Sequence, residues 1–246
     1  MKLLTLTILG VVSAWPIQKR ADRLVYWLLA GDSTTAPNGG WGDAYLGTTV
    51  AAGSSGHNYG HSGATTASFR AGGDWAKVIK DIGTNKDESD VWVTIQFGHN
   101  DQKTTSGVTL DQYKTNLKNF ATEAKTAGAT PVLVTPLTRR TFSGKPAKVV
   151  ENLAEQRNAT IAVANTNSFG YIDLNIASEN YVNAIGQTAA DKYNLADGDR
   201  THLNPWGGVV FARIVSDLLV AKFPQLDSVT KKNETLSALI AAGKPA

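Results

Sequence analysis

The chain has 246 residues, a length that suits one α/β domain with a sizeable core. Its 24 Lys and Arg residues exceed its 21 Asp and Glu residues by three, and Lys2, Lys19 and Arg20 account for that excess. A chain processed after residue 20 is therefore charge-balanced, which argues against nucleic acid or an anionic membrane as partner. The absence of cysteine excludes disulfides and thiolate metal sites, and we expect neither a metal nor a cofactor.

The N-terminal segment has the composition of a targeting sequence. The apolar run Leu3–Val12 is too short to span a bilayer, and it ends in the small residues Val12-Ser13-Ala14, which suit signal peptidase. Lys19-Arg20 then fits a dibasic processing site. We therefore expect residues 1–20 to be a signal peptide with a short pro-segment, and the protein to be secreted into the extracellular space.

The remainder of the chain, residues 21–246, is expected to form a single domain. It contains no internal repeat, no linker and no change of composition that would mark a second domain. Two N-glycosylation sequons, at Asn158 and Asn233, agree with a secreted glycoprotein. We expect this domain to be a monomer.

Predicted strands and helices alternate along the first half of the chain. Residues 24–30 form an unbroken apolar run, the pattern of a strand buried on both faces, which ends at Gly31-Asp32-Ser33-Thr34. A short helix is expected at 41–49 and a weak edge strand at 57–59. Apolar residues at positions 75, 78, 79 and 82 have helical spacing and predict a helix over 74–82.

The second half continues this alternation. Its Val, Ile and aromatic content predicts further strands at 91–97, 131–135 and 171–174. Helices are expected at 110–128, 148–164, 176–195 and 205–223. The polar tail from Leu226 receives no assignment. Strands alternating with helices predict an α/β fold, a three-layer α/β/α sandwich around a five-stranded, mostly parallel sheet.

Ser33 is the candidate nucleophile. It lies just past the carboxyl end of the first predicted strand, where open α/β sheets place their ligands. Gly31 tolerates the dihedral angles of a sharp turn, and Asp32 can accept hydrogen bonds from backbone N–H groups within it. Taken alone, Gly-Asp-Ser-Thr fits an ordinary strand-to-helix turn equally well.

A hydroxyl nucleophile needs a base, and the chain offers four histidines, at positions 57, 61, 99 and 202. His202 follows Asp199 by three residues in a polar loop before a helix. At that spacing the carboxylate can accept the Nδ1 proton and leave Nε2 free as the base. Ser33, Asp199 and His202 thus form a candidate triad, although Asp199 and His202 by themselves also fit a helix cap. Thr35 replaces the last glycine of a Gly-x-Ser-x-Gly elbow, which argues against an α/β-hydrolase.

Acyl transfer also needs donors for the oxyanion that develops. The candidates are the backbone N–H of Ser33, the backbone N–H of Gly63 and the side-chain amide of Asn100, just past the third predicted strand. We interpret His99 as a structural residue in preference to a substrate contact, and His57 and His61 as surface residues.

Four blocks of the chain resemble those of the SGNH, or GDSL-type, hydrolases. They are Gly31-Asp32-Ser33-Thr34, Gly63, Gly98-His99-Asn100-Asp101 and Asp199-Arg-Thr-His202, in this order. The resemblance covers residues 31–202. It implies a flavodoxin-like sheet, with Ser33 as nucleophile, His202 as base, Asp199 as its partner, and Gly63, Asn100 and the Ser33 backbone as the oxyanion hole.

Within that superfamily the chain is similar to rhamnogalacturonan acetylesterases. The similarity rests on Gly-Asp-Ser-Thr, on Asn58 five residues before Gly63, and on Thr135-Pro-Leu-Thr-Arg-Arg140. It implies a serine esterase that removes acetyl groups from pectin, with an acetylated polysaccharide as the partner. The well-known fungal members carry disulfides, whereas this chain has no cysteine.

Arg139 and Arg140 are candidate substrate-binding residues. They follow the fourth predicted strand, so they lie at the same edge of the sheet as Ser33. Guanidinium groups bind carboxylates through paired hydrogen bonds, which would suit a uronic acid beside the acetylated sugar. The alternative is that both arginines lie in a solvated loop and bind no substrate. For Trp41 and Trp206 the sequence fits two roles equally well, stacking on sugar rings and packing within the protein.

Two other functions compete with a carbohydrate acetylesterase. A lipase or thioesterase of the same superfamily would need an exposed apolar groove, whereas the loops that carry the motifs are polar. An inactive carbohydrate-binding protein would have no need to keep Ser33 and His202, and both are present.

Overall fold

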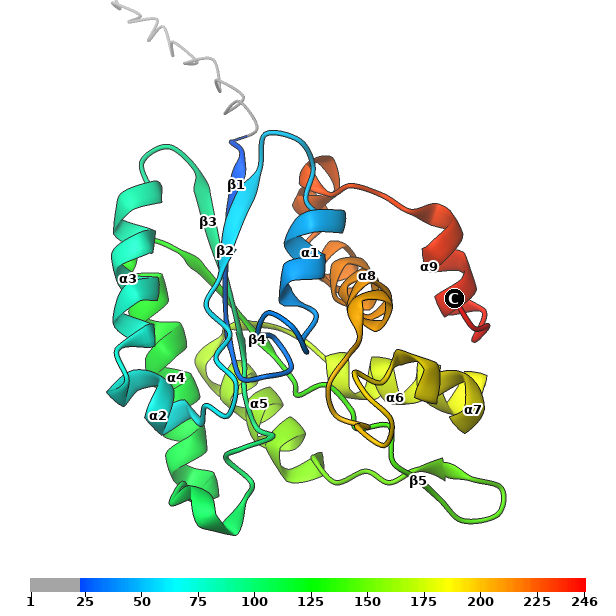
Figure 1. The fold of residues 1–246 in the computed structure, drawn as a ribbon. Helices are drawn as coiled ribbons and strands as arrows, with labels where there is room; N and C mark the ends of the chain where they lie inside the picture. The colour runs from blue at the N-terminus through cyan, green and yellow to red at the C-terminus, as the bar shows by residue number, and fades with distance from the viewer. Residues whose placement is uncertain (1–22) are drawn as a thin grey trace, which may run out of the picture.

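A computed structural model describes residues 23–246, and the expected signal peptide and pro-segment lie outside them. The centre is a five-stranded sheet in which every pair of neighbouring strands is parallel (Figure 1). In spatial order the strands are β2 (Ser55–Asn58), β1 (Val25–Gly31), β3 (Asp90–Gln96), β4 (Thr130–Val134) and β7 (Gly170–Ile172). This is the flavodoxin-like order 2-1-3-4-5 along the sheet, and it confirms the expected α/β sandwich.

Helices cover both faces of the sheet (Figure 1). One face carries α2 (Thr66–Ala71), α3 (Asp74–Asn85), α4 (Leu110–Ala127) and α5 (Ala154–Asn167). The other carries α1 (Gly42–Thr48), α6 (Leu174–Ile185), α8 (Pro205–Lys222) and α9 (Glu234–Ala241). None of the described helices is long and apolar enough to cross a bilayer.

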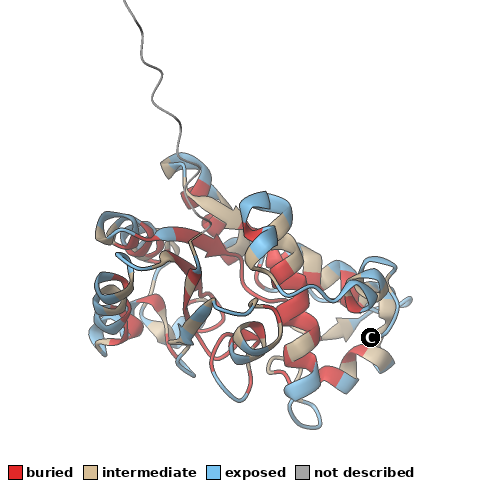
Figure 2. Ribbon diagram, turned by 90° about the horizontal axis from the view of Figure 1, so that it is seen from above, coloured by how far each residue is buried: buried red, intermediate tan, exposed pale blue. Residues whose placement is uncertain are grey.

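The apolar run of β1 separates the two halves of the core. Trp27 and Leu29 face α1 and α8, whereas Leu28 and Ala30 face α3 and α4, because successive strand side chains point to opposite faces. All four side chains are buried, and the burial colours show the same buried interior between two partly exposed helical layers (Figure 2). The run is unbroken because both faces of this strand are covered.

The predicted signals at helix ends are confirmed for α4 and α8. Thr109 and Gln112 form a reciprocal capping box at the start of α4, and Gly128 ends that helix with a φ of 109°. The side chain of Asn204 accepts a hydrogen bond from the backbone of Gly207, with Pro205 as the first residue of α8.

Two predicted elements differ from the structure near β7. The helix expected at 148–164 begins only at Ala154, because Lys148-Val149 pairs with Phe142-Ser143 in a two-stranded hairpin, β6 with β5. The strand expected at 171–174 ends at Ile172, because the side chain of Asp173 caps the start of α6.

The segments after β7 also differ from their prediction. The single helix expected at 176–195 is divided at Gly186, where a φ of 77° ends α6, and continues as α7 (Gln187–Ala190) and a 3₁₀ turn (Asp191–Tyr193). The unassigned tail forms a 3₁₀ helix (Pro224–Val229) and α9, which pack against α8 through the buried Leu226 and Leu236. A further 3₁₀ turn (Thr104–Ser106) lies between β3 and α4.

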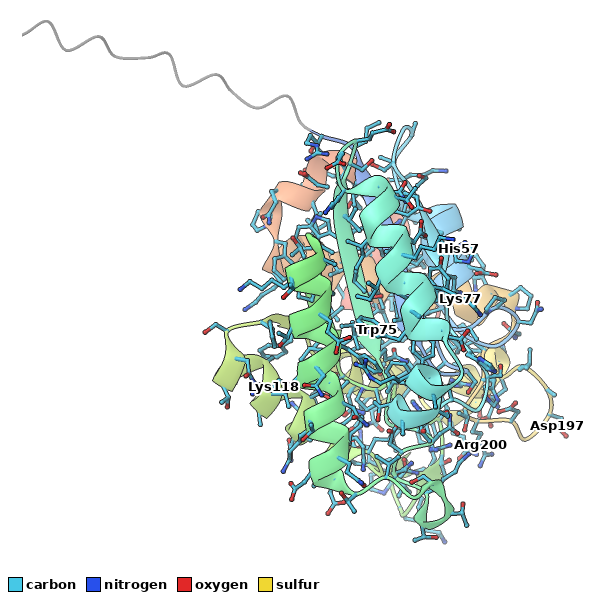
Figure 3. The ribbon with its side chains drawn as sticks, turned by 90° about the vertical axis from the view of Figure 1, so that its left-hand side faces the viewer. His57, Trp75, Lys77, Lys118, Asp197 and Arg200 are labelled. Atoms are coloured by element: carbon cyan, nitrogen blue, oxygen red, sulfur yellow. The ribbon has the colours of Figure 1, made fainter. Side chains whose placement is uncertain are left out.

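The core beneath α3 and α4 can be tested at Phe120. Phe120 of α4 is fully buried among Phe69, Trp75 and Phe97, whereas Lys118 of the same helix points outward (Figure 3). Phe120→Ala should lower the free energy of unfolding by about 3–5 kcal/mol, because the three neighbouring aromatic rings lose their contacts with Phe120 and a cavity is left in its place. Urea unfolding measures this, with Lys118→Ala as control. A change below 1 kcal/mol in Phe120→Ala would contradict this packing.

Candidate active site

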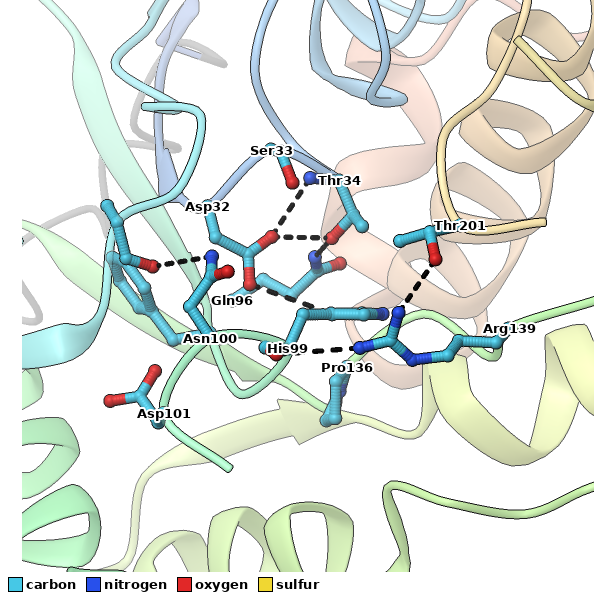
Figure 4. Close-up of polar contacts among 12 residues, drawn as sticks. Asp32, Ser33, Thr34, Gln96, His99, Asn100, Asp101, Pro136, Arg139 and Thr201 are labelled. Atoms are coloured by element: carbon cyan, nitrogen blue, oxygen red, sulfur yellow. Dashed lines mark hydrogen bonds and ion pairs between the residues drawn. The ribbon is translucent and has the colours of Figure 1, made fainter. Parts of the chain in front are cut away.

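The turn after β1 is built around Gly31 and Asp32. Gly31 does not adopt a positive φ; its lack of a side chain is required by space, since a Cβ would lie 2.8 Å from the carbonyl oxygen of Gln96. Asp32 is fully buried, and its Oδ1 accepts hydrogen bonds from the backbone N and the Oγ1 of Thr34, at 2.9 and 2.8 Å (Figure 4). These bonds hold Ser33 at the apex of the turn.

The structure brings Ser33, His202 and Asp199 together. The Nε2 atom of His202 lies 2.9 Å from the Oγ of Ser33, across 169 residues of chain. The Nδ1 atom of the same ring lies 2.9 Å from Oδ2 of Asp199. The three candidate residues therefore have the contacts that a serine hydrolase requires of its nucleophile, base and orienting acid.

Asp199 is held by its own loop. Its Oδ1 accepts hydrogen bonds from the backbone N–H groups of Thr201 and His202, at 3.1 and 3.0 Å. Partial burial acts to raise the pKa of Asp199, but the hydrogen bonds from His202 and Thr201 outweigh it and lower the pKa. Asp199 is thus ionised at neutral pH and can fix the His202 tautomer with Nδ1 protonated.

The three candidate oxyanion donors lie in three different loops. Within residues 23–246, no hydrogen bond uses the backbone N–H of Ser33 or of Gly63, so neither donor is committed to another protein group. Gly63 is exposed and has a φ of 82°, a conformation that favours glycine. Asn100 lies beside Asp32 at the end of β3, facing the same turn (Figure 4).

Two contacts fix the orientation of the Asn100 amide. Its Nδ2 donates to the carbonyl oxygen of Ala64 at 3.0 Å, and its Oδ1 accepts from the Nζ of Lys103 at 2.7 Å. One Nδ2 proton is left for a ligand, and the ammonium group polarises the amide from its other end. Lys103 was not predicted from the sequence; a lysine three residues after the amide, in the same turn, was the available signal.

His99 lies beneath the turn and is not accessible to a ligand. Its ring is buried, with Nδ1 3.5 Å from Oδ2 of Asp32 (Figure 4). Burial acts to raise the pKa of Asp32, but His99 and the hydrogen bonds from Thr34 outweigh it and lower the pKa. The pair supports the interpretation of His99 as a structural residue.

Trp41 and Gln96 form a second buried support that the sequence did not predict. Trp41 is fully buried, and its Nε1 donates to Oε1 of Gln96 at 2.8 Å, while the Nε2 of Gln96 donates to the Oγ1 of Thr34. Trp41 therefore packs and does not stack on sugars. Trp206 is 51% exposed, and its Nε1 donates to the carbonyl oxygen of Ala246.

Arg139 connects two loops of the site. One guanidinium nitrogen donates to the Oγ1 of Thr201 at 2.7 Å, and another lies 3.5 Å from the carbonyl oxygen of His99 (Figure 4). The side chain is partly exposed. Arg139 therefore links the loop of the candidate base to the loop of Asn100, and it retains donors for a ligand.

Arg140 has a different environment from the one expected. Its side chain is fully buried, so it cannot contact a uronic acid of a polymer, and the expectation of a substrate contact is corrected for this residue. Its Nε donates to Oδ1 of Asn194 at 2.8 Å, and its Nη2 donates to the backbone carbonyl of His202 at 2.5 Å. The guanidinium thus braces the loop that carries Asp199 and His202 from the inside.

Burial lowers the pKa of Arg140 to about 10, against the opposing effect of Asp199 and Asp191. Arg140 is therefore a cation at neutral pH. The pair Arg139-Arg140 after β4 indicated a ligand contact in the sequence. The structural role of Arg140 left no local signal, because its partners lie at residues 194–202, far along the chain.

Comparisons with known proteins identify the family of the chain. The model of the GDSL-like lipase/acylhydrolase family matches residues 29–208. The rhamnogalacturonan acetylesterase RhgT of Bacillus subtilis is 31% identical over 208 residues, which are 77% of this chain and 87% of RhgT.

Solved structures show the same fold. The Bacillus subtilis protein YXIM is 25% identical with a TM-score of 0.69, and the match covers 82% of this chain but 58% of YXIM. A lipase/acylhydrolase from Enterococcus faecalis (17% identity, TM-score 0.56) is matched over 80% of this chain and 96% of its own. The acetylxylan esterase Axe2 from Geobacillus stearothermophilus (19%, 0.55) is matched over 80% and 93%. The last two are likenesses of fold alone.

Removal of the Arg140 brace provides a test. Arg140→Met should lower kcat on 4-nitrophenyl acetate by about 10²-fold with little change in KM, because a small displacement of His202 disturbs proton transfer and not substrate binding. Arg140→Lys should recover part of the loss, since it keeps the charge without the planar fork.

The matched control is Arg70→Met, which removes an exposed guanidinium paired with Glu123 on α4. Circular dichroism at the assay temperature establishes that each variant is folded. An unchanged kcat in folded Arg140→Met would contradict the brace.

Proposed function

The chain belongs to the GDSL-like lipase/acylhydrolase family, and from that premise we propose that it removes O-acetyl groups from rhamnogalacturonan by a Ser-His-Asp mechanism. The observation that carries the proposal is the 2.9 Å contact between His202 Nε2 and Ser33 Oγ, with Asp199 on the other ring nitrogen. Family membership supports an esterase, and the 31% identity to RhgT supports the substrate.

In the acylation step, Ser33 Oγ attacks the acetyl carbonyl carbon while His202 Nε2 takes the hydroxyl proton. Asp199 stabilises the resulting imidazolium, and the oxyanion is bound by the N–H groups of Ser33 and Gly63 and by the Asn100 amide. The imidazolium then gives its proton to the departing sugar hydroxyl. An acetylated Ser33 is left.

In the deacylation step, His202 takes a proton from water as the water oxygen attacks the acetyl group on Ser33. Collapse of the second tetrahedral intermediate returns the proton to Ser33 and releases acetic acid, which keeps the other proton of the water. Each proton that His202 accepts is given back, so the protein needs no further co-reactant.

The polar surroundings of Ser33 support a small acyl group on a sugar over a long-chain ester. Asn100 and Asp101 follow β3 at this edge, and the partly exposed Arg139 keeps free donors for the carboxylate of a neighbouring galacturonic acid. An extracellular polymer as substrate also agrees with the predicted signal peptide.

Asn100→Ala tests the oxyanion assignment. Loss of one donor typically lowers kcat by about 10²–10³-fold, and because the donor acts on charge that develops in the transition state, KM should change little. Steady-state kinetics with 4-nitrophenyl acetate provide the measurement. Asn85→Ala, at the far end of α3, is the control and should match wild type. A rise in KM alone would make Asn100 a ground-state contact.

The substrate assignment is tested by acetate release from acetylated rhamnogalacturonan, xylan and chitin oligomers. The wild-type protein should act best on rhamnogalacturonan, and Ser33→Ala should lose several orders of magnitude on every polymer that the wild-type protein deacetylates. A preference for xylan would overturn the pectin assignment and leave the esterase. Activity retained by purified Ser33→Ala would mean that Ser33 is not the nucleophile.

A further inference from the structure

A second histidine–carboxylate pair lies beside the loop of Gly63, outside the residues that the proposed mechanism uses. The Nδ1 atom of His61 lies 2.6 Å from Oδ2 of Asp74, the first residue of α3. The interpretation of His61 as a surface residue agrees with its side chain, which is 61% exposed, whereas the side chain of Asp74 is only 13% exposed. The pair therefore ties an exposed loop to the largely buried start of a helix.

Asp74 is ionised at neutral pH. Its partial burial acts to raise the pKa, but the hydrogen bonds from Lys77 and His61 outweigh it and lower the pKa of this carboxyl. An ionised carboxylate only accepts hydrogen bonds, so the Nδ1 atom of His61 carries the proton that joins the two groups. A hydrogen bond to a charged acceptor is stronger than one between neutral groups, and this one fixes the orientation of the ring.

His61 begins the turn that carries Gly63. The backbone N–H of Ala64 donates to the carbonyl oxygen of His61 at 3.1 Å, which closes a four-residue β-turn. Gly63 is its third residue, where a φ of 82° is typical of a type II turn. The closing bond leaves the N–H of Gly63, the proposed oxyanion donor, outside it. The direction in which this donor points is therefore set by the orientation of the turn as a whole.

Packing contributes little to the orientation of this turn. Ser62 and Gly63 are exposed, and a Cβ on Gly63 would meet no atom of the described residues within 4 Å beyond its chain neighbours. Hydrogen bonds at the two ends of the turn hold it instead. At its far end, the carbonyl oxygen of Ala64 accepts from Nδ2 of Asn100 at 3.0 Å (Figure 4).

At its near end the turn has two anchors, and both are on His61. The backbone N–H of His61 donates to the carbonyl oxygen of Gly31 at 3.0 Å, which attaches the turn to the end of β1. A single hydrogen bond leaves the turn free to rotate about that bond. The contact between the ring and Asp74 attaches a second atom of the same residue to α3 and opposes this rotation.

We propose that Asp74 and His61 are a positioning pair for the oxyanion hole, which directs the N–H of Gly63 toward the acetyl oxygen. The inference rests on the proposed function, because it needs Gly63 to be an oxyanion donor. Neither residue of the pair has to touch the substrate. Its effect belongs to the transition state, since the donor acts on charge that develops there and much less on the neutral ester.

Replacement of His61 tests the pair. His61→Phe keeps a ring without the donor, and kcat on 4-nitrophenyl acetate should fall about 10- to 100-fold with KM within about 2-fold of wild type, because the oxyanion donor is displaced. His61→Asn should recover part of this loss, since its Nδ2 can donate in the place of Nδ1. The midpoint of thermal unfolding should change little, because an exposed pair adds little stability. A rise in KM alone would make His61 a substrate contact and overturn the positioning role.

Lys77→Met is the matched control. Lys77 is as exposed as His61, at 62%, and its Nζ donates to the other oxygen of the Asp74 carboxylate at 2.7 Å (Figure 3). Its removal leaves the contact with His61 in place, so kcat should stay within about 2-fold of wild type. Equal losses in Lys77→Met and His61→Phe would overturn the pair, since a general disturbance at the start of α3 would then explain both.

A double variant tests whether the two residues act through one contact. Asp74→Ala combined with His61→Phe should lose no more kcat than the more impaired of the two single variants, because either change alone breaks the same hydrogen bond. Losses that multiply in the double variant would show two separate effects and overturn the pair.

Inhibition by methylboronic acid provides a readout besides turnover. Ser33 Oγ adds to boron as its proton passes to His202, and the tetrahedral boronate anion that forms resembles the transition state. Its Ki should rise in His61→Phe by about the factor by which kcat falls. An unchanged Ki would place the loss outside the oxyanion hole and overturn the positioning role. Activity retained by Ser33→Ala would instead overturn the proposed function, whatever the His61 variants do.

Discussion

The contact between Ser33 and His202 is the constraint that the rest of the site serves. Its two residues come from opposite ends of the chain, and each is immobilised by its own loop before they meet. Ser33 follows a strand buried on both faces, and Asp32 fixes the turn through Thr34. His202 precedes α8, whose start is fixed by Asn204 and Pro205.

A buried cation makes this arrangement possible. Arg140 donates to neutral oxygens of Asn194 and His202, and within the described residues it has no carboxylate as a direct ion-pair partner. Burying a guanidinium in this way is costly unless each donor finds an acceptor. Among the described residues the Nη1 atom of Arg140 has no acceptor, so its burial carries a cost, but the rigid, planar group holds the side chain of Asn194 and the backbone of His202 at once.

The sheet and the loops contribute differently to the site. Ser33 and Asn100 lie shortly after β1 and β3, so the sheet fixes the positions of their turns. The partly exposed Arg139 lies on the loop that follows β4. For the acetylesterase that we propose, the acetyl group offers little to distinguish one ester from another, so selectivity would come from such loops, which can vary without disturbing the sheet.

Local patterns in the sequence determined the order of strands and helices, because burial on two faces and helix caps leave signals within a few residues, as in β1 and at Asn204. They also selected Ser33, Asp199 and His202 as candidates, since the chain has only four histidines, His202 follows an acid by three residues, and Ser33 follows a buried strand. The hairpin at 142–149 and the break at Gly186 were missed because pairing and packing overrode the local pattern.

Only the tertiary structure decided that Arg140 is internal while Arg139 is partly exposed, and that Lys103 polarises Asn100. Two adjacent arginines carry the same local signal, and which of them is buried depends on partners more than fifty residues away.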